Sequence, residues 1–268
     1  MGRVTTLSEP AGFPAELRRR RTERRISQLD LALRAGTTQR HLSFMERGRS
    51  RPGRAMVIRI AESLELPLRD RNSLLNAAGY APVYPETRWE TDLLGPVREA
   101  LDVILRGHLP YPAVVLRPYG ELVAANEAVG LLTEGVPAEL LRPPVNLIRL
   151  LLHPDGLARR VRNLPEWGRH VTGNLRRTLE TRPQDTRLAA FVAELETYLP
   201  PTAPGPDHLG FAVPLRLTAP EGELRLITTI TSFATALDVT LAELHLEAFL
   251  PADEPTAEIL RARAAAAR

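Results

Sequence analysis

Residues 27–52 carry the side chains best suited to recognise another molecule. Gln39, Arg40, Ser43 and Phe44 fall on one face of a predicted short helix, away from its apolar positions. Glutamine pairs best with the N6/N7 edge of adenine and arginine with the O6/N7 edge of guanine, while a phenylalanine ring can contact a thymine methyl or simply pack. These residue types at this spacing predict contacts with the base edges of double-stranded DNA.

Two short helices around a tight turn must position this face. Ser27 can cap the first helix, because its hydroxyl accepts a hydrogen bond from an otherwise unpaired backbone N–H. Gly36 suits the turn, since glycine adopts the left-handed conformation at little cost. Thr37 or Thr38 can cap the second helix, which buries Leu42. This layout is typical of a DNA-reading helix-turn-helix, and an ordinary helical hairpin is the alternative.

The same residues resemble a known family. The pattern Gln28-x-x-x-Ala32-x-x-x-Gly36-Thr-Thr-Gln39 resembles phage-repressor (XRE-type) helix-turn-helix domains. The strings RHLSFMERGRSRP and LPLRDRNSLLNAAGYAPVY resemble a narrower bacterial group, XRE regulators with a C-terminal MmyB-like ligand-binding domain. This resemblance implies that Gln28 and Thr38 contact phosphate. It also implies that the basic loop containing Arg49 and Arg51 lies along the sugar-phosphate backbone.

Charged residues are distributed unequally along the chain. Residues 1–82 hold 16 arginines against 8 acidic residues, whereas the remainder holds 19 arginines against 24 acidic residues. A basic head on an acidic body is expected when a DNA-binding domain is joined to a domain that does not touch DNA. The arginine-rich run RRRRTERR in the head can contact phosphates or form a solvated helix face.

The length of 268 residues suggests two domains. We expect a flexible leader over residues 1–13 and a five-helix, phage-repressor-like domain over residues 14–80. The proline-rich segment APVYPE begins a linker and connecting helix over residues 81–110. That helix can join the domains, line a dimer interface or pack within its own domain.

From residue 111 the hydrophobic period changes from helical to alternating. Arg117-Pro118-Tyr119-Gly120 predicts a type I turn in a first hairpin, and Ala219-Pro220-Glu221-Gly222 predicts a second. Helices separate these hairpins, and a last alternating strand ends near Leu250. Two strands, a helical insert and three antiparallel strands is a PAS-like order. We therefore expect an α+β fold with a PAS-like domain over residues 111–252 and a C-terminal tail over residues 253–268.

The strings AANEAVGLL, NLIRLLLHPDGL and LITTITSFATALDVTLAELHLEAFLPAD also resemble the MmyB-like domain. The resemblance implies a small apolar ligand, with a fatty acid as the expected chemistry. Apolar residues that can line its cavity, or can simply form the core, are Val115, Leu122, Leu150, Leu151, Trp167, Phe211 and Ile230. Arg149 and His153 share a helix face, where they can hold a carboxylate, pair with local acids or face solvent.

Several classes of function are disfavoured. Cysteine is absent, which excludes disulfides, thiolate catalysis and cysteine-ligated metals. No nucleophile elbow, zinc-protease pair or glycine-rich phosphate loop occurs, and the six histidines lack metal-ligand spacing. We expect no enzyme activity, no metal and no cofactor. Without a signal peptide or a long apolar run, we expect a cytoplasmic protein that does not bind membranes.

The combined interpretation is a ligand-responsive transcription regulator. A homodimer would bind operator DNA, and a small apolar effector would shift the spacing of its two heads. Two alternatives remain open. The C-terminal domain can be a sensor that holds haem on His153 or a flavin, or it can bind a partner protein instead of a ligand.

Overall fold

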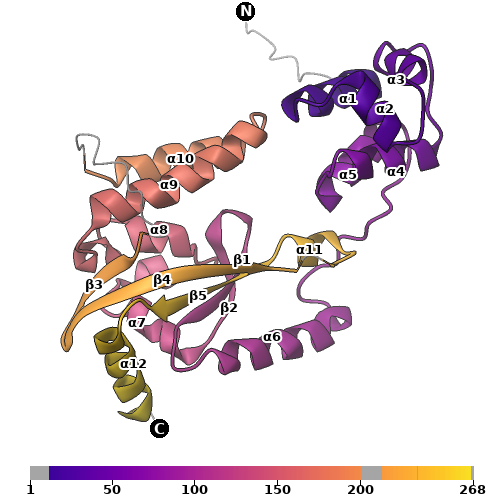
Figure 1. Cartoon of the computed structure of the whole chain (residues 1–268). Helices are drawn as coiled ribbons and strands as arrows, with labels where there is room; N and C mark the ends of the chain where they lie inside the picture. Colours follow the sequence, from indigo (N-terminus) through magenta and orange to yellow (C-terminus); the bar gives the residue numbers. More distant parts are fainter. Residues whose placement is uncertain (1–11, 201–212, 234, 267–268) are drawn as a thin grey trace, which may run out of the picture. The chain divides into compact units, whose positions relative to one another are not determined.

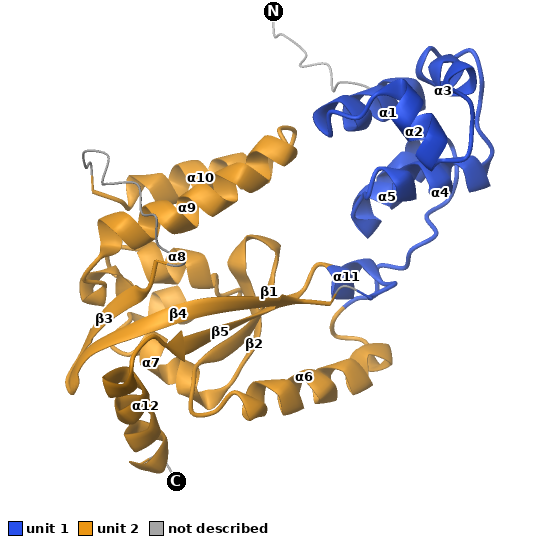
Figure 2. Cartoon of the chain, viewed as in Figure 1, with its two compact units in different colours: residues 1–88, 235–242 blue, residues 89–234, 243–268 orange. Residues whose placement is uncertain are grey.

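The computed structural model describes residues 12–200, 213–233 and 235–266, which form two compact units. Unit 1 comprises residues 1–88 and 235–242, and unit 2 comprises residues 89–234 and 243–268 (Figure 2). Residues 1–11 of the predicted leader lie outside the described residues.

Unit 1 is helical (Figure 1). Its first five helices confirm the predicted helix-turn-helix architecture: α1 (Phe13–Glu23), α2 (Gln28–Arg34), α3 (Gln39–Glu46), α4 (Arg54–Ser63) and α5 (Leu68–Ala77). The short helix α11 (Val239–Ala242) also belongs to this unit. Leu17, Leu31, Leu42 and Ile60 are fully buried in one shared core. The helices are short, so this shared core stabilises them more than helix propensity does.

Local chemistry sets the boundaries of the helix-turn-helix. The Ser27 hydroxyl accepts a hydrogen bond from the Asp30 N–H at 3.0 Å, and the Thr38 hydroxyl accepts one from the His41 N–H at 3.1 Å. Between the two helices Gly36 adopts φ +63°, a conformation in which a side chain would be strained. Ser27 and Gly36 thus act as the sequence predicts.

Unit 2 contains one antiparallel five-stranded sheet of order β2-β1-β5-β4-β3. Its strands are β1 (Ala113–Arg117), β2 (Glu121–Ala125), β3 (Leu215–Ala219), β4 (Gly222–Ser232) and β5 (His245–Pro251). Two strands precede the helical insert and three follow it, which confirms the predicted α+β fold.

The remaining helices all belong to unit 2. They are α6 (Gly95–Gly107), α7 (Gly130–Thr133), α8 (Leu147–Leu152), α9 (Leu164–Thr181), α10 (Thr186–Thr197) and α12 (Glu254–Ala266). In Figure 1, α9 and α10 lie on one side of the sheet and α6 on the other. Val114 and Leu116 of β1 join the core with α8, α9 and α10, while α6, whose Leu101 is buried, contacts β1.

Two features of unit 2 differ from the sequence expectations. The hairpin at residues 117–120 is not a type I turn, because Tyr119 has φ +66° whereas the third residue of a type I turn has a negative φ. Pro118 holds a negative φ at the second position, so this combination is that of a type II turn. The predicted tail contains α12, which is anchored by the buried Leu260 and by an ion pair between Arg263 and Glu221. β3 begins at Leu215, and Phe211, which the sequence predicts to line the ligand cavity, lies outside the described residues.

Candidate functional site

Helix α3 presents the predicted base-reading side chains. Thr38, Gln39 and Arg40 are exposed at its N-terminal end, while Ser43 and Phe44 are half-buried one turn later. The capping bond from Thr38 fixes the direction in which this end of the helix points. Side chains of the first turn of a recognition helix are the ones that reach base edges in the major groove.

The ring of Phe44 contacts two arginine side chains of the recognition-helix region. The guanidinium carbons of Arg40 and Arg47 lie 5.3 and 5.5 Å from the centre of its ring. Both distances fall within the range of a cation–π contact, which is attractive and restricts the arginine side chain. This arrangement favours packing over thymine contact for Phe44, and it leaves the donors of Arg40 exposed for another partner.

Gln28 belongs to a hydrogen-bonded network with α1 and α3. Its amide donates to Glu46 at 2.6 Å, and the Arg21 guanidinium donates to the same carboxylate at 2.6 and 3.1 Å. The Glu46 side chain is only 3% exposed, so its charge requires these donors. Gln28 therefore joins the two helices of the motif to α1, a role that the sequence pattern did not indicate.

Arginines of unit 1 divide into paired and unpaired groups. In the run on α1, Arg19 and Arg20 form ion pairs with Glu16, and Arg21 forms one with Glu46, which favours a structural role for these three arginines.

Arg49 and Arg51, in contrast, are exposed and form no ion pair within the described ranges. Exposed arginines without an acidic partner are suited to phosphate contact.

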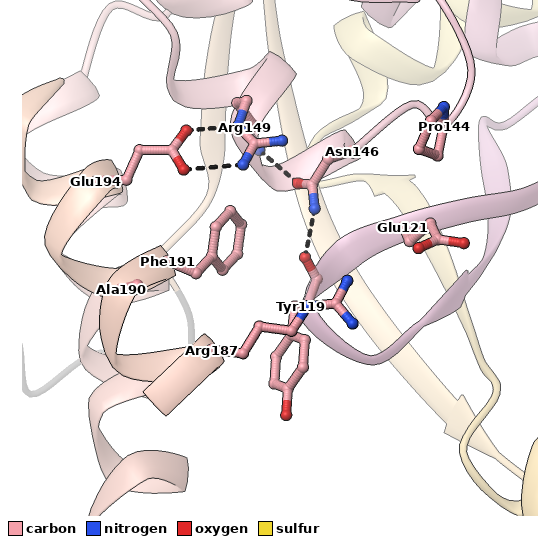
Figure 3. Close-up of a pocket in the computed structure, with 9 residues that line it drawn as sticks. All are labelled: Tyr119, Glu121, Pro144, Asn146, Arg149, Arg187, Ala190, Phe191 and Glu194. Atoms are coloured by element: carbon pink, nitrogen blue, oxygen red, sulfur yellow. Dashed lines mark hydrogen bonds and ion pairs between the residues drawn. The ribbon is translucent and has the colours of Figure 1, made fainter. Parts of the chain in front are cut away.

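Unit 2 contains a cavity of about 290 Å³ between the first hairpin, α8 and α10 (Figure 3). Aromatic, apolar and charged side chains share its lining: Tyr119, Glu121, Pro144, Asn146, Arg149, Arg187, Ala190, Phe191 and Glu194. The volume lies near the lower end of the range for small-molecule sites. Among the described residues that the sequence predicts to bind the ligand, Arg149 alone lines this cavity.

Arg149 is held at one end of the cavity by Glu194 of α10 (Figure 3). Its guanidinium donates to the two carboxylate oxygens at 2.5 and 2.8 Å and lies 5.4 Å from the Phe191 ring centre. Hydrogen bonds from Arg149 lower the pKa of Glu194, and those to Glu194 raise the pKa of Arg149. Arg149 thus pairs with a local acid, one of the roles that the sequence left open.

His153 lies beside this pair and not in the cavity lining. Its ring packs edge-on against Tyr198, with 5.0 Å between ring centres, and Tyr198 donates a hydrogen bond to Glu194 at 2.7 Å. The His153 Nδ1 atom accepts from the Asp155 N–H at 3.0 Å. Arg149 and His153 are therefore linked through Tyr198 and Glu194.

The opposite end of the cavity contains groups that the sequence analysis missed. Tyr119 donates a hydrogen bond to Asp185, and the Arg187 guanidinium lies 5.4 Å from the Tyr119 ring centre. Burial and the Asp185 carboxylate raise the pKa of Tyr119 to about 12, so the phenol stays protonated. Asn146 donates to the Tyr119 carbonyl at 2.7 Å, which fixes the hairpin against α8.

The other predicted ligand residues do not gather around one cavity. Leu150, Leu151 and Trp167 are buried core residues, and Leu122 packs against that core. Val115 pairs with Leu246 on the opposite face of the sheet, because side chains alternate along a strand.

Ile230 does not line this cavity, and the residue is 66% exposed. Among the described strands, β3 pairs with β4 only as far as Leu226, and β5 pairs with this part of β4 on the other side. For Phe211 the structure provides no test, because it lies outside the described residues.

No group of three histidine, aspartate or glutamate side chains in the described ranges could hold a metal ion. None of the helices described combines the length and the hydrophobicity needed to cross a bilayer.

Comparisons with known protein families agree with this geometry. The model of the MmyB-like transcription regulator ligand binding domain matches residues 97–262, and a helix-turn-helix model matches residues 17–70. A search of curated proteins gives no match. The first match covers more than half of the chain, and the second contains α2 and α3. The chain therefore belongs to the MmyB-like transcription regulators, in which a DNA-binding helix-turn-helix is joined to a ligand-binding domain.

Proposed function

We propose that this regulator binds an operator sequence-specifically, with Gln39 and Arg40 of α3 reading base edges. The observation that carries this proposal is the exposure of both side chains on the capped first turn of α3, with Arg40 held against Phe44. Thr38, Arg49 and Arg51 contact phosphates beside them, and Ser43 adds a weaker contact. Gln28, which is half-buried, supports the motif through Glu46 and contacts a phosphate beside it. The regulator acts in the cytoplasm, where its DNA lies.

The operator is bound by a homodimer. One helix-turn-helix reads only a few base pairs, so two copies are needed for a unique site. The half-sites are then separated by about 10 bp, or a multiple of it, because both recognition helices enter the same side of the duplex. Selection of tight-binding duplexes from a random-sequence library, followed by footprinting, tests both points. A single unrepeated half-site protected by a monomer contradicts the dimer, and an absence of sequence enrichment contradicts specific binding.

In unit 2, the proposed effector is a small apolar acid of the fatty-acid class. The supporting observation is a cavity that combines Phe191, Tyr119 and Pro144 with the Arg149 guanidinium. A buried carboxylate needs a charged donor, and Arg149 supplies one when the acid takes the place of Glu194. Because the cavity is small, a medium-chain acid fits it better than a long-chain acid.

Calorimetric titration with octanoate and palmitate tests this effector class. Wild-type protein should bind octanoate, and Arg149→Ala should weaken that binding more than it weakens binding of octane. Arg106→Ala, on the exposed surface of α6, is the matched control and should change neither. If Arg149→Ala keeps its fold and binds octanoate as wild type does, the head group is held elsewhere or the effector is not an acid.

A further inference from the structure

The segment that joins β4 to β5 belongs to the other unit. Residues 235–242, here called the arm, group with the helix-turn-helix helices of unit 1 although both flanking strands belong to unit 2 (Figure 2). The chain therefore passes between the units three times: after residue 88, before residue 235 and after residue 242. The linker alone would provide only one of these connections.

Asp238 fixes the arm to the linker. Its side chain is buried, and one carboxylate oxygen accepts the Thr87 N–H at 3.0 Å while the other accepts the Leu241 N–H at 3.3 Å. The Val239 N–H donates to the Pro85 carbonyl at 2.8 Å, and the Val239 side chain is fully buried. One carboxylate thus caps α11 and binds the linker, so its removal leaves two partly buried N–H groups without their acceptor.

The linker is in turn fixed to helix α5. Asn72 accepts the N–H groups of Val83 and Tyr84, each at 3.1 Å, and donates to the Tyr84 carbonyl at 2.7 Å. The Arg71 guanidinium lies 5.6 Å from the Tyr84 ring centre and donates to its hydroxyl at 3.2 Å. Arm, linker and α5 are therefore joined by a continuous set of hydrogen bonds.

We propose that the arm couples the two units and that Asp238 is its positioning residue. This inference rests on the proposed function, since it describes how a ligand-binding domain controls a DNA-binding domain. In the sequence, the arm lies between the paired residues Ser232 and His245, so a shift between β4 and β5 would displace the chain on both sides of the arm. Coupling is reciprocal, and DNA bound to unit 1 must therefore alter β4 and β5 in unit 2.

Hydrogen exchange of the full chain, with and without a duplex selected from a random library, tests this coupling. In wild type, the duplex should protect α3 and also change exchange at the paired ends of β4 and β5. In Asp238→Ala, the Thr87 amide should exchange on the order of tenfold faster. The duplex should still protect α3, but the change in β4 and β5 should be lost. Asp238→Asn keeps one acceptor oxygen and should therefore retain part of the change in exchange that the duplex causes in β4 and β5.

The matched control is Asp253→Ala. Asp253 caps α12 by accepting the Thr256 N–H at 3.0 Å, so this variant also removes a helix cap but lies outside the arm. It should keep the response of β4 and β5 to DNA. The coupling role is overturned if wild-type β4 and β5 do not respond while α3 is protected, or if Asp238→Ala responds as wild type does. Absence of α3 protection in wild type would instead contradict the proposed DNA binding.

Discussion

At the scale of single residues, Arg40 is the most direct test of base reading. Arg40→Ala should lose about 1–3 kcal/mol of binding to the selected operator and should relax the preference at one base pair. Competition binding against a random duplex measures this, with Arg106→Ala of unit 2 as the control. An equal loss on both duplexes would mean that Arg40 contacts phosphate.

The buried carboxylate of Glu46 gives a second prediction at this scale. Glu46→Ala leaves Arg21 and Gln28 without their acceptor and should destabilise unit 1 by about 3–5 kcal/mol. Arg19→Ala removes ion pairs of a more exposed side chain and should cost less than about 1 kcal/mol. Exchange of the α1 and α3 amides in mild denaturant compares the two variants. Equal effects would contradict the network described for Glu46.

Residues that act through local chemistry were predictable from the sequence. Ser27 and Gly36 are examples, because capping and a positive φ depend on a few neighbouring positions. The pairing of Arg21 with Glu46, 25 positions apart, was not, and neither was the bond between Tyr119 and Asp185. Such pairs form only after helices distant in sequence come together, so composition and spacing contain no direct signal of them.

At the scale of elements, the pair between Arg149 and Glu194 joins α8 to α10. Because Arg149 holds the pKa of Glu194 below its ordinary value of 4.5, the carboxylate stabilises unit 2 above that pH. This contribution is lost as the pH falls through the lowered pKa.

Glu194→Gln should therefore be less stable than wild type near neutral pH, by about 0.5–1 kcal/mol because the pair is partly exposed. The difference should shrink at acid pH, where the wild-type carboxylate is protonated too. Urea unfolding followed by tryptophan fluorescence measures this, since Trp89 and Trp167 both lie in unit 2. A difference that does not depend on pH would show that the pair has no electrostatic role.

Element types were more predictable than their register. Helix α8 (Leu147–Leu152), for example, is one of the helices that the sequence predicts between the two hairpins. The face of the sheet on which each strand residue lies was harder to predict, because a shift of one residue in the strand register moves a side chain to the other face. For this reason Val115 and Leu122 were assigned to one cavity, although they lie on opposite faces. The helix α12 was missed because its alanine-rich sequence has only a few buried anchors.

At the scale of the whole molecule, the charge asymmetry follows the two units. The arginine-rich head contains the helix-turn-helix, and the acidic remainder contains the ligand-binding domain. Sequence alone could suggest this division, but not that residues 235–242 belong to unit 1. A segment that lies between two strands has no compositional mark of the unit on which it packs.

We propose that ligand occupancy in unit 2 changes DNA binding by unit 1. The most direct measurement is a titration of the selected operator duplex with and without octanoate, together with a titration of octanoate with and without the duplex. Because coupling is reciprocal, the two affinities should change by the same factor. Operator affinity that stays constant while octanoate is bound would contradict it.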